Sequence, residues 1–185
     1  HHPWPIIDEV AEAGAAPSEI RRYRGVSRDL GPAPSSIRAV DTGAQTLFRQ
    51  RRSAVDMDGE SWIDEREFFR IAASLMPSSS RPPLSSLPWA PAIDTAFFVH
   101  RVRGLEPGLY YLNRVGASLE ELRALHDERF HWEHPDGCPE SLPLFRLSTG
   151  DTRDAAAAIS CSQDIASGGA FAVSMIADFE GRLLD

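Results

Sequence analysis

The sequence lacks several features that define large classes of protein. No apolar run approaches the roughly 20 residues that a membrane-spanning helix needs, and no basic-then-apolar leader opens the chain. Basic residues are in the minority, because 19 Lys and Arg stand against 27 Asp and Glu and the net charge is −8. A nucleic-acid binder needs a basic face to neutralise phosphates. We therefore expect neither a nucleic acid nor a membrane as the partner.

Cysteine is also scarce. Cys138 and Cys161 are the two cysteines of the chain, and they are too far apart in sequence to form a C-x-x-C pair. This usage is typical of free thiols in a reducing compartment, so we expect a cytoplasmic protein without a disulfide. No internal repeat is visible.

The 185 residues suit one domain with a sizeable core. We expect a loop-rich N-terminal extension over residues 1–41 and one α+β domain over 42–185, which looks incomplete at its C-terminal end. Hydrophobic periodicity and capping residues predict helices over 42–50, 64–76, 118–125 and 151–167, the third with Leu119, Leu122 and Leu125 on its buried side. Strands are expected over 95–102, 109–113, 144–147 and 170–177, the last of them buried.

Residues 56–67, DMDGESWIDERE, are compatible with a calcium loop. Carboxylates stand at loop positions 1, 3, 5, 9 and 12, as such a loop requires. Position 6, however, is Ser61, where the sharp turn favours glycine. The preceding RQRRSAV is basic, and no second such loop occurs. We therefore favour a turn at Asp58-Gly59 and a helix that begins at Asp64-Glu65, and keep calcium binding as a third hypothesis for function.

Arg51, Arg52 and Ser53 form a short cluster of donors. Two guanidinium groups and a hydroxyl match a phosphate in geometry and charge. A solvated basic turn explains the same three residues, so the cluster alone does not identify a ligand.

The segments that follow give this cluster a context. After R-R-S come a predicted helix, P-S-S at 77–79 and P-W at 88–89, and then FFVHRVRGLEPGLYYLNR and ISCSQDIASGGAFAV. This order resembles the nitroreductase superfamily, and the last two segments resemble its SagB-type dehydrogenase branch. The resemblance covers residues 45–177.

The resemblance implies an FMN-dependent oxidoreductase with a mostly antiparallel sheet covered by helices. It implies a homodimer, or a pseudo-dimer with a second nitroreductase-like domain, with flavin at the interface. Arg51 and Ser53 would bind the flavin phosphate or ribityl chain, with Arg52 nearby in the cofactor site, and Ser78 and Ser79 would face the flavin. In this family NAD(P)H is a possible electron donor, and the substrate would be a small molecule or a peptide. The resemblance does not assign a catalytic role to any residue of this chain.

The chain departs from this family at three points. After P-S-S, Arg81, Pro82 and an insertion stand where the family usually has an Asn and a Gln before P-W. Val55 stands where the family often has a basic residue, and the C-terminal third of the family has no counterpart here. A second hypothesis therefore stays open, in which a non-catalytic domain with a degenerate flavin site serves assembly or recognition.

Other reactive residues have simpler interpretations. His126, His131, His134 and Cys138 are close enough in sequence for zinc, but a surface loop with incidental histidines explains them better. We expect Cys161 to be a small buried residue.

Overall fold

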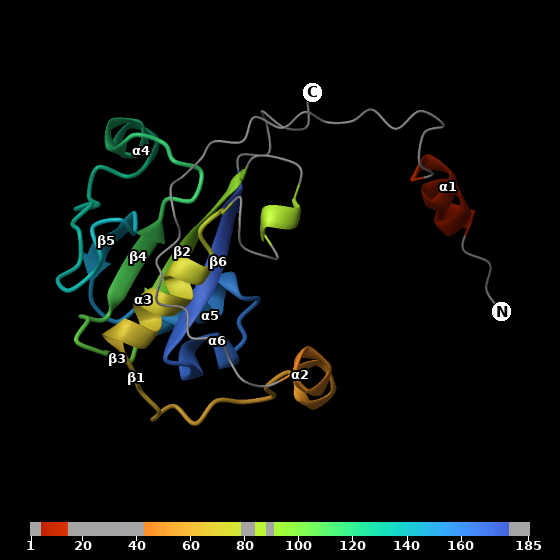
Figure 1. Ribbon diagram of the computed structural model, residues 1–185, viewed down its shortest axis with the longest axis horizontal. Coiled ribbons are helices and arrows are strands. Elements are labelled where there is room, and N and C mark those ends of the chain that lie inside the picture. The colour runs from red at the N-terminus through yellow and green to blue at the C-terminus, as the bar shows by residue number, and fades with distance from the viewer. Residues whose placement is uncertain (1–4, 15–42, 79–83, 88–90, 178–185) are drawn as a thin grey trace.

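The centre of the molecule is an antiparallel sheet of four strands. The computed structural model describes residues 5–14, 43–78, 84–87 and 91–177. The strand order is β5-β4-β2-β6, and every neighbouring pair is antiparallel (Figure 1). A second sheet pairs β1 with β3 in parallel. This arrangement confirms the predicted α+β class with an antiparallel sheet.

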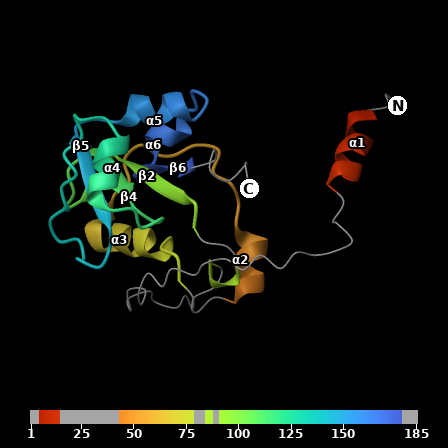
Figure 2. The ribbon, with the colours of Figure 1, turned by 90° about the horizontal axis from the view of Figure 1, so that it is seen from above.

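The described helices are α1 (Pro5–Ala13), α2 (Ala44–Gln50), α3 (Glu65–Ser74), α4 (Leu119–Leu125), α5 (Arg153–Ile159) and α6 (Ile165–Gly168), with a 3-10 turn η1 (Leu84–Ser86). The strands are β1 (Ile63–Asp64), β2 (Ile93–Val99), β3 (Val102–Arg103), β4 (Gly108–Leu112), β5 (Leu144–Thr149) and β6 (Phe171–Ala177). Figure 2 shows α3 on one side of the sheet and α5 and α6 on the other.

Helix α3 supplies most of one core layer. The Asp64 carboxylate caps it by accepting the Glu67 N–H at 2.9 Å. Phe68 is fully buried, and its ring centre lies 5.2 Å from that of Phe97 and 5.3 Å from that of Phe171, both edge to face. The predicted helix over 64–76 is confirmed, and its aromatic face fixes α3 on strands β2 and β6.

Strands β2 and β4, which correspond to the strands expected over 95–102 and 109–113, pair antiparallel. The backbone of Gly108 approaches β5 so closely that a Cβ atom there would lie 2.1 Å from the Ser148 carbonyl oxygen. Glycine is therefore required at the start of β4. Tyr110 and Tyr111 point to opposite faces of the sheet, and both are buried, so each face carries a core layer. Helix α4 and its loop cover the Tyr111 side of the sheet.

Three expectations about burial and helix length are wrong. The helix predicted over 151–167 is broken into α5 and α6, because Cys161 and Ser162 adopt left-handed backbone angles, with φ of 57° and 60°. Cys161 is exposed rather than buried. Leu125 is 80% exposed, since α4 ends there and its side chain lies beyond the core.

Strand β6 is present where expected, but the expectation that it is buried is wrong, because each of its residues is exposed or only partly buried. In the described part of the chain it pairs with β2 alone, so it forms an edge of the sheet. Val173, Met175 and Ile176 are exposed on it. The expected loop-rich extension also contains a helix, α1, with no buried residue. The remainder of residues 1–41 lies outside the described residues.

Candidate functional site

The R-R-S segment lies directly after α2 and is exposed. The side chains of Arg51 and Ser53 make no hydrogen bond or ion pair with the described residues. Arg52 differs, because its Nη1 donates to the carbonyl oxygens of Arg49 at 2.7 Å and of Arg51 itself at 2.9 Å. Two of the three predicted donors are therefore available to a ligand, while the third stiffens the end of α2.

The predicted serine contacts lie beyond the other end of α3. Ser78 follows Pro77 and is half-buried. Ser79, like Pro88 and Trp89, lies outside the described residues. Of the two serines expected to face a flavin, the structure therefore places Ser78.

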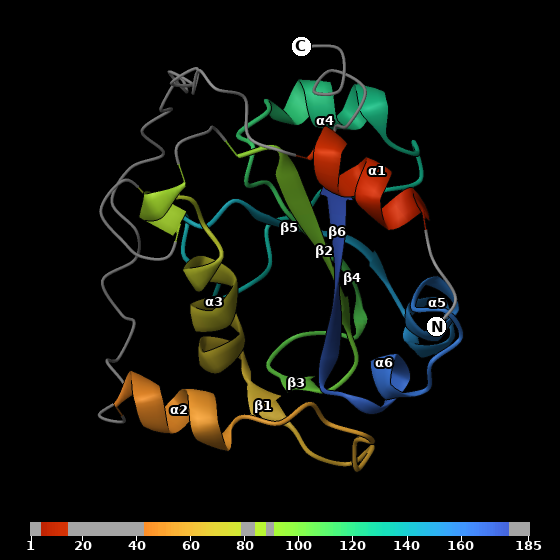
Figure 3. The same cartoon turned by 90° about the vertical axis from the view of Figure 1, so that its right-hand side faces the viewer.

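The structure does not bring the two predicted halves of the flavin site to one end of the domain. Figures 1 and 3 place α2 toward the end of the domain where β1 lies and α3 begins, and they place η1 beyond the end where α3 stops. R-R-S follows α2, whereas Ser78 follows α3. The ten residues of α3 span about 15 Å. One copy of the described chain thus carries the two groups at opposite ends of a helix.

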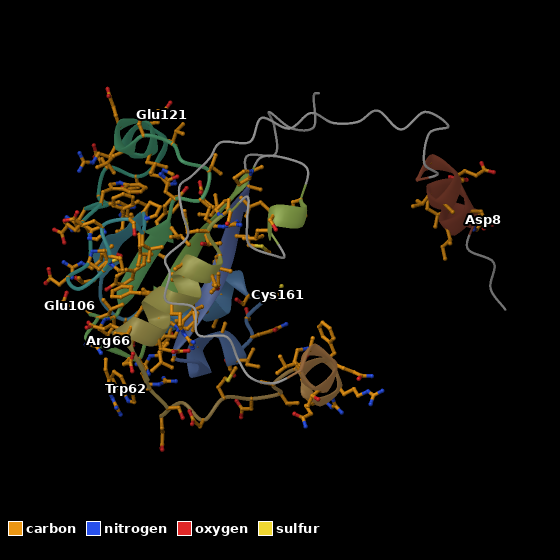
Figure 4. The ribbon with its side chains drawn as sticks, in the orientation of Figure 1. Asp8, Trp62, Arg66, Glu106, Glu121 and Cys161 are labelled. Atoms are coloured by element: carbon orange, nitrogen blue, oxygen red, sulfur yellow. The ribbon has the colours of Figure 1, made fainter. Side chains whose placement is uncertain are left out.

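A pocket that the sequence did not predict lies where β2 ends. Its volume is about 560 Å³, in the range of small-molecule sites. Its lining includes Trp62, His100, Arg101 and Arg153. Figure 4 shows Trp62 and Glu106, another lining residue, at the same end of the domain. The available sequence signal was the His-Arg pair at the end of a strand that runs into a turn.

The pocket contains a neutral imidazole, that of His100, and a charged carboxylate, that of Asp151. Burial lowers the pKa of His100, whose Nε2 lies 3.1 Å from the Ala166 carbonyl oxygen. Hydrogen bonds from Arg153, at 2.9 and 2.5 Å, hold the pKa of Asp151 well below its usual range. The imidazole is therefore neutral near pH 7 and the carboxylate charged.

The loop at 56–67 is organised as a turn, not as a calcium cage. Asp58 accepts hydrogen bonds from the Glu60 and Ser61 N–H groups and from the Ser61 hydroxyl, and the last of these is the largest influence lowering its pKa to about 2. Gly59, with φ of 70°, makes the turn. Across the described residues, no group of three or more His, Cys, Asp or Glu side chains could hold a metal ion.

Of the histidines considered for zinc, His126 packs against aromatic rings, whereas His131 and His134 are exposed. His126 lies edge to face with Tyr111 and Trp132, at ring-centre distances of 5.3 and 5.2 Å. Cys138 belongs to the other core cluster, beside α3. The four residues considered for zinc therefore do not converge. Both cysteines are free thiols, as the sequence predicts.

Comparison of the chain with protein-family models, curated proteins and solved structures gives no match. Among the described residues, no helix has both the length and the apolar character needed to cross a membrane.

Proposed function

We propose that the chain is an FMN-dependent oxidoreductase domain of the nitroreductase type, similar to the SagB-type dehydrogenases. FMN, when bound, supplies the hydride chemistry through its ring system. The protein's part is to bind the cofactor and to orient it toward a donor such as NAD(P)H and toward a small-molecule or peptide substrate. Its free thiols fit a cytoplasmic location.

The observation that carries this proposal is the state of the R-R-S segment. Arg51 and Ser53 are separated by one residue, and both are exposed and without side-chain partners among the described residues. A guanidinium group and a hydroxyl in this state fit a terminal phosphate, since they can bond to it without first breaking internal contacts. Arg52 donates hydrogen bonds to two carbonyl oxygens at the end of α2, so it stabilises the backbone conformation of the proposed phosphate site.

The element order around R-R-S also supports the proposal. A helix precedes the segment, an amphipathic helix follows it, P-S-S comes next, and the chain then enters a central antiparallel strand. This is the order that the family resemblance implies.

Two chains, or two fused domains, complete the flavin site in this proposal. R-R-S and Ser78 lie at opposite ends of α3, so one copy does not surround a single flavin with both. A two-fold arrangement places R-R-S of one copy beside P-S-S of the other. The site is then shared, and the oligomer is a homodimer or a pseudo-dimer.

A mixing experiment tests this arrangement. The double variant Arg51→Ala, Ser53→Ala and the double variant Ser78→Asp, Ser79→Asp should each lose FMN binding, the second because carboxylates repel the anionic cofactor. Unfolding the two together and refolding them should restore about one quarter of the sites, because half the dimers are mixed and each has one intact site. Arg123→Ala, which removes a charge from exposed α4, is the matched control. If mixing restores no binding while each variant still forms dimers, the shared site is wrong.

A second candidate function has one specific observation in its favour. Strand β6 exposes Val173, Met175 and Ile176 along a sheet edge, and such edges pair readily with other chains. A non-catalytic domain that serves assembly would use this edge and bind no flavin. Dimers that form without FMN, and never retain it, would favour this candidate.

A further inference from the structure

The pocket at the end of β2 is separate from the residues proposed for flavin. None of R-R-S and neither serine lines it. It is built where β1 and β3 pair in parallel, with Ile63 opposite Val102. The residues just before these two are Trp62 and Arg101, so the register sets an aromatic ring and a guanidinium group side by side at the pocket wall.

Arg101 is an unusual wall residue because it is charged and only 9% exposed. Its Nε donates to the Ser61 carbonyl oxygen at 3.2 Å, and its Nη2 donates to those of Gly168 and Gly169 at 2.5 and 2.9 Å. Its Nη1 has no partner among the described residues, and no described carboxylate lies within 4 Å of the group. Carbonyl oxygens satisfy its hydrogen bonds but not its charge, and a buried charge without a counter-ion is costly.

The other charged residues of the pocket are already paired. Asp151 bonds to Arg153, and Glu106 bonds to Arg146 at 2.9 Å. His100 contributes no charge near pH 7, since burial lowers its pKa. Asp58, which borders the pocket at Gly59, uses its carboxylate on its own turn. Arg101 is therefore the positive charge at this wall that forms no ion pair within 4 Å with a described carboxylate, and Asp58 attracts it only from a longer distance.

The second recognition element is apolar. Trp62 is 49% exposed, so about half of its indole surface is open to the pocket and to solvent. Pro107 lines the same pocket. Indole and proline surfaces bind flat rings well, because stacking removes apolar area from water and aligns the ring quadrupoles.

We propose that this pocket binds a small organic anion: a carboxylate or a phosphate monoester on a planar ring. The anionic group bonds to Nη1 of Arg101 and neutralises its charge, and the ring stacks on Trp62. A pocket of about 560 Å³ holds a molecule of this size with room for a substituent. The proposal does not depend on flavin binding.

Isothermal titration of the full chain with benzoate, phenyl phosphate and neutral benzamide tests the proposal. At least one of the two anions should bind saturably, with a dissociation constant of about 1 mM or lower, and benzamide should bind roughly tenfold more weakly. The tighter anion identifies the ligand as a carboxylate or a phosphate. Affinity should fall as salt rises, because the Arg101 contact is ionic.

Two variants connect the binding to the named residues. Trp62→Ala should weaken anion binding roughly tenfold, whereas Trp62→Phe should keep it within about threefold, since a ring remains. Both changes are at a partly exposed residue, so folding is kept. Arg101→Gln should abolish the preference for anions; circular dichroism checks its fold, and the Trp62 pair decides the question if it unfolds. Saturation by neither anion, equal binding of benzamide, or unchanged affinity in Trp62→Ala would each overturn the proposal.

Discussion

Asp94 and Arg101 are both charged and both buried, 8% and 9% exposed, but they are satisfied differently. Asp94 receives three donors: the Tyr111 hydroxyl at 2.7 Å and the Arg114 and Val115 N–H groups at 2.5 and 2.8 Å. Arg101 bonds to carbonyl oxygens and keeps one nitrogen for the pocket. The first residue therefore fixes structure, while the second is placed to bind.

Replacing Asp94 by alanine should be strongly destabilising. The change leaves a buried hydroxyl and two buried N–H groups without acceptors, which costs about 2–4 kcal/mol of unfolding free energy. Urea unfolding followed by circular dichroism measures this loss. Asp136→Ala is the control, because Asp136 is exposed and has no described partner. A loss under about 0.5 kcal/mol for Asp94→Ala would show that the network is not formed.

The two thiols should react very differently with a disulfide reagent such as DTNB. Cys161 is exposed, whereas burial raises the pKa of the Cys138 thiol from 9.0 to about 12. We expect rapid labelling of one thiol in the native protein and of both in concentrated urea. Cys161→Ser should remove the fast phase. A fast phase that survives this substitution would place Cys138 at the surface.

The burial of the Cys138 thiol makes the stability of the fold depend on pH. The folded state holds the Cys138 proton between pH 9.0 and about 12, where the unfolded chain has lost it. The folded state thus binds more protons in this range, so this contribution to stability is complete below pH 9 and is lost as pH rises. Tyr110 acts in the same direction, since burial raises its pKa to about 12. Urea midpoints should fall above pH 9, and less so in Cys138→Ala.

The helices and strands that are determined by neighbouring residues in the sequence could be predicted. The features that depend on contacts with distant segments could not. The Asp64 cap and the apolar spacing after it define α3, and the P-G turn defines the β2–β4 pair. The break between α5 and α6 has no such signal, because an alanine-rich run favours helix and does not specify left-handed angles at Cys161 and Ser162. The exposure of β6 depends on which segments cover the sheet, and an apolar run cannot reveal that.

Replacing Gly108 or Gly43 by alanine should change the stability of the fold by very different amounts. At Gly108 the new Cβ would lie 2.1 Å from the Ser148 carbonyl oxygen, so β4 and β5 must separate, at a cost of about 2–3 kcal/mol. At Gly43, before α2, nothing lies within 4 Å and φ is −56°, so alanine fits. Because Gly43 is the N-cap of α2, where alanine is a poorer cap than glycine, that change should cost no more than about 1 kcal/mol. Thermal unfolding measures the loss of stability in each variant. Equal losses in the two variants would contradict the close approach of β4 to β5 at Gly108.

At the scale of the whole molecule, the predicted site residues and the observed pocket lie in different places. The sequence motifs located R-R-S and P-S-S along the chain, but their positions at opposite ends of α3 depend on the length and direction of that helix. The pocket depends on one pairing between distant segments, since β1 and β3 bring Trp62 next to Arg101. Residues 39 positions apart give no local sign of this contact.

The flavin proposal needs a cofactor that stays with the folded protein. The most direct measurement is the absorbance spectrum of the purified chain after incubation with FMN and removal of the excess. We predict a retained flavin band at ~450 nm that is lost in Arg51→Ala, Ser53→Ala and kept in Arg123→Ala. A folded chain that stays colourless at every FMN concentration, or a band that survives the double substitution, would contradict the proposed function.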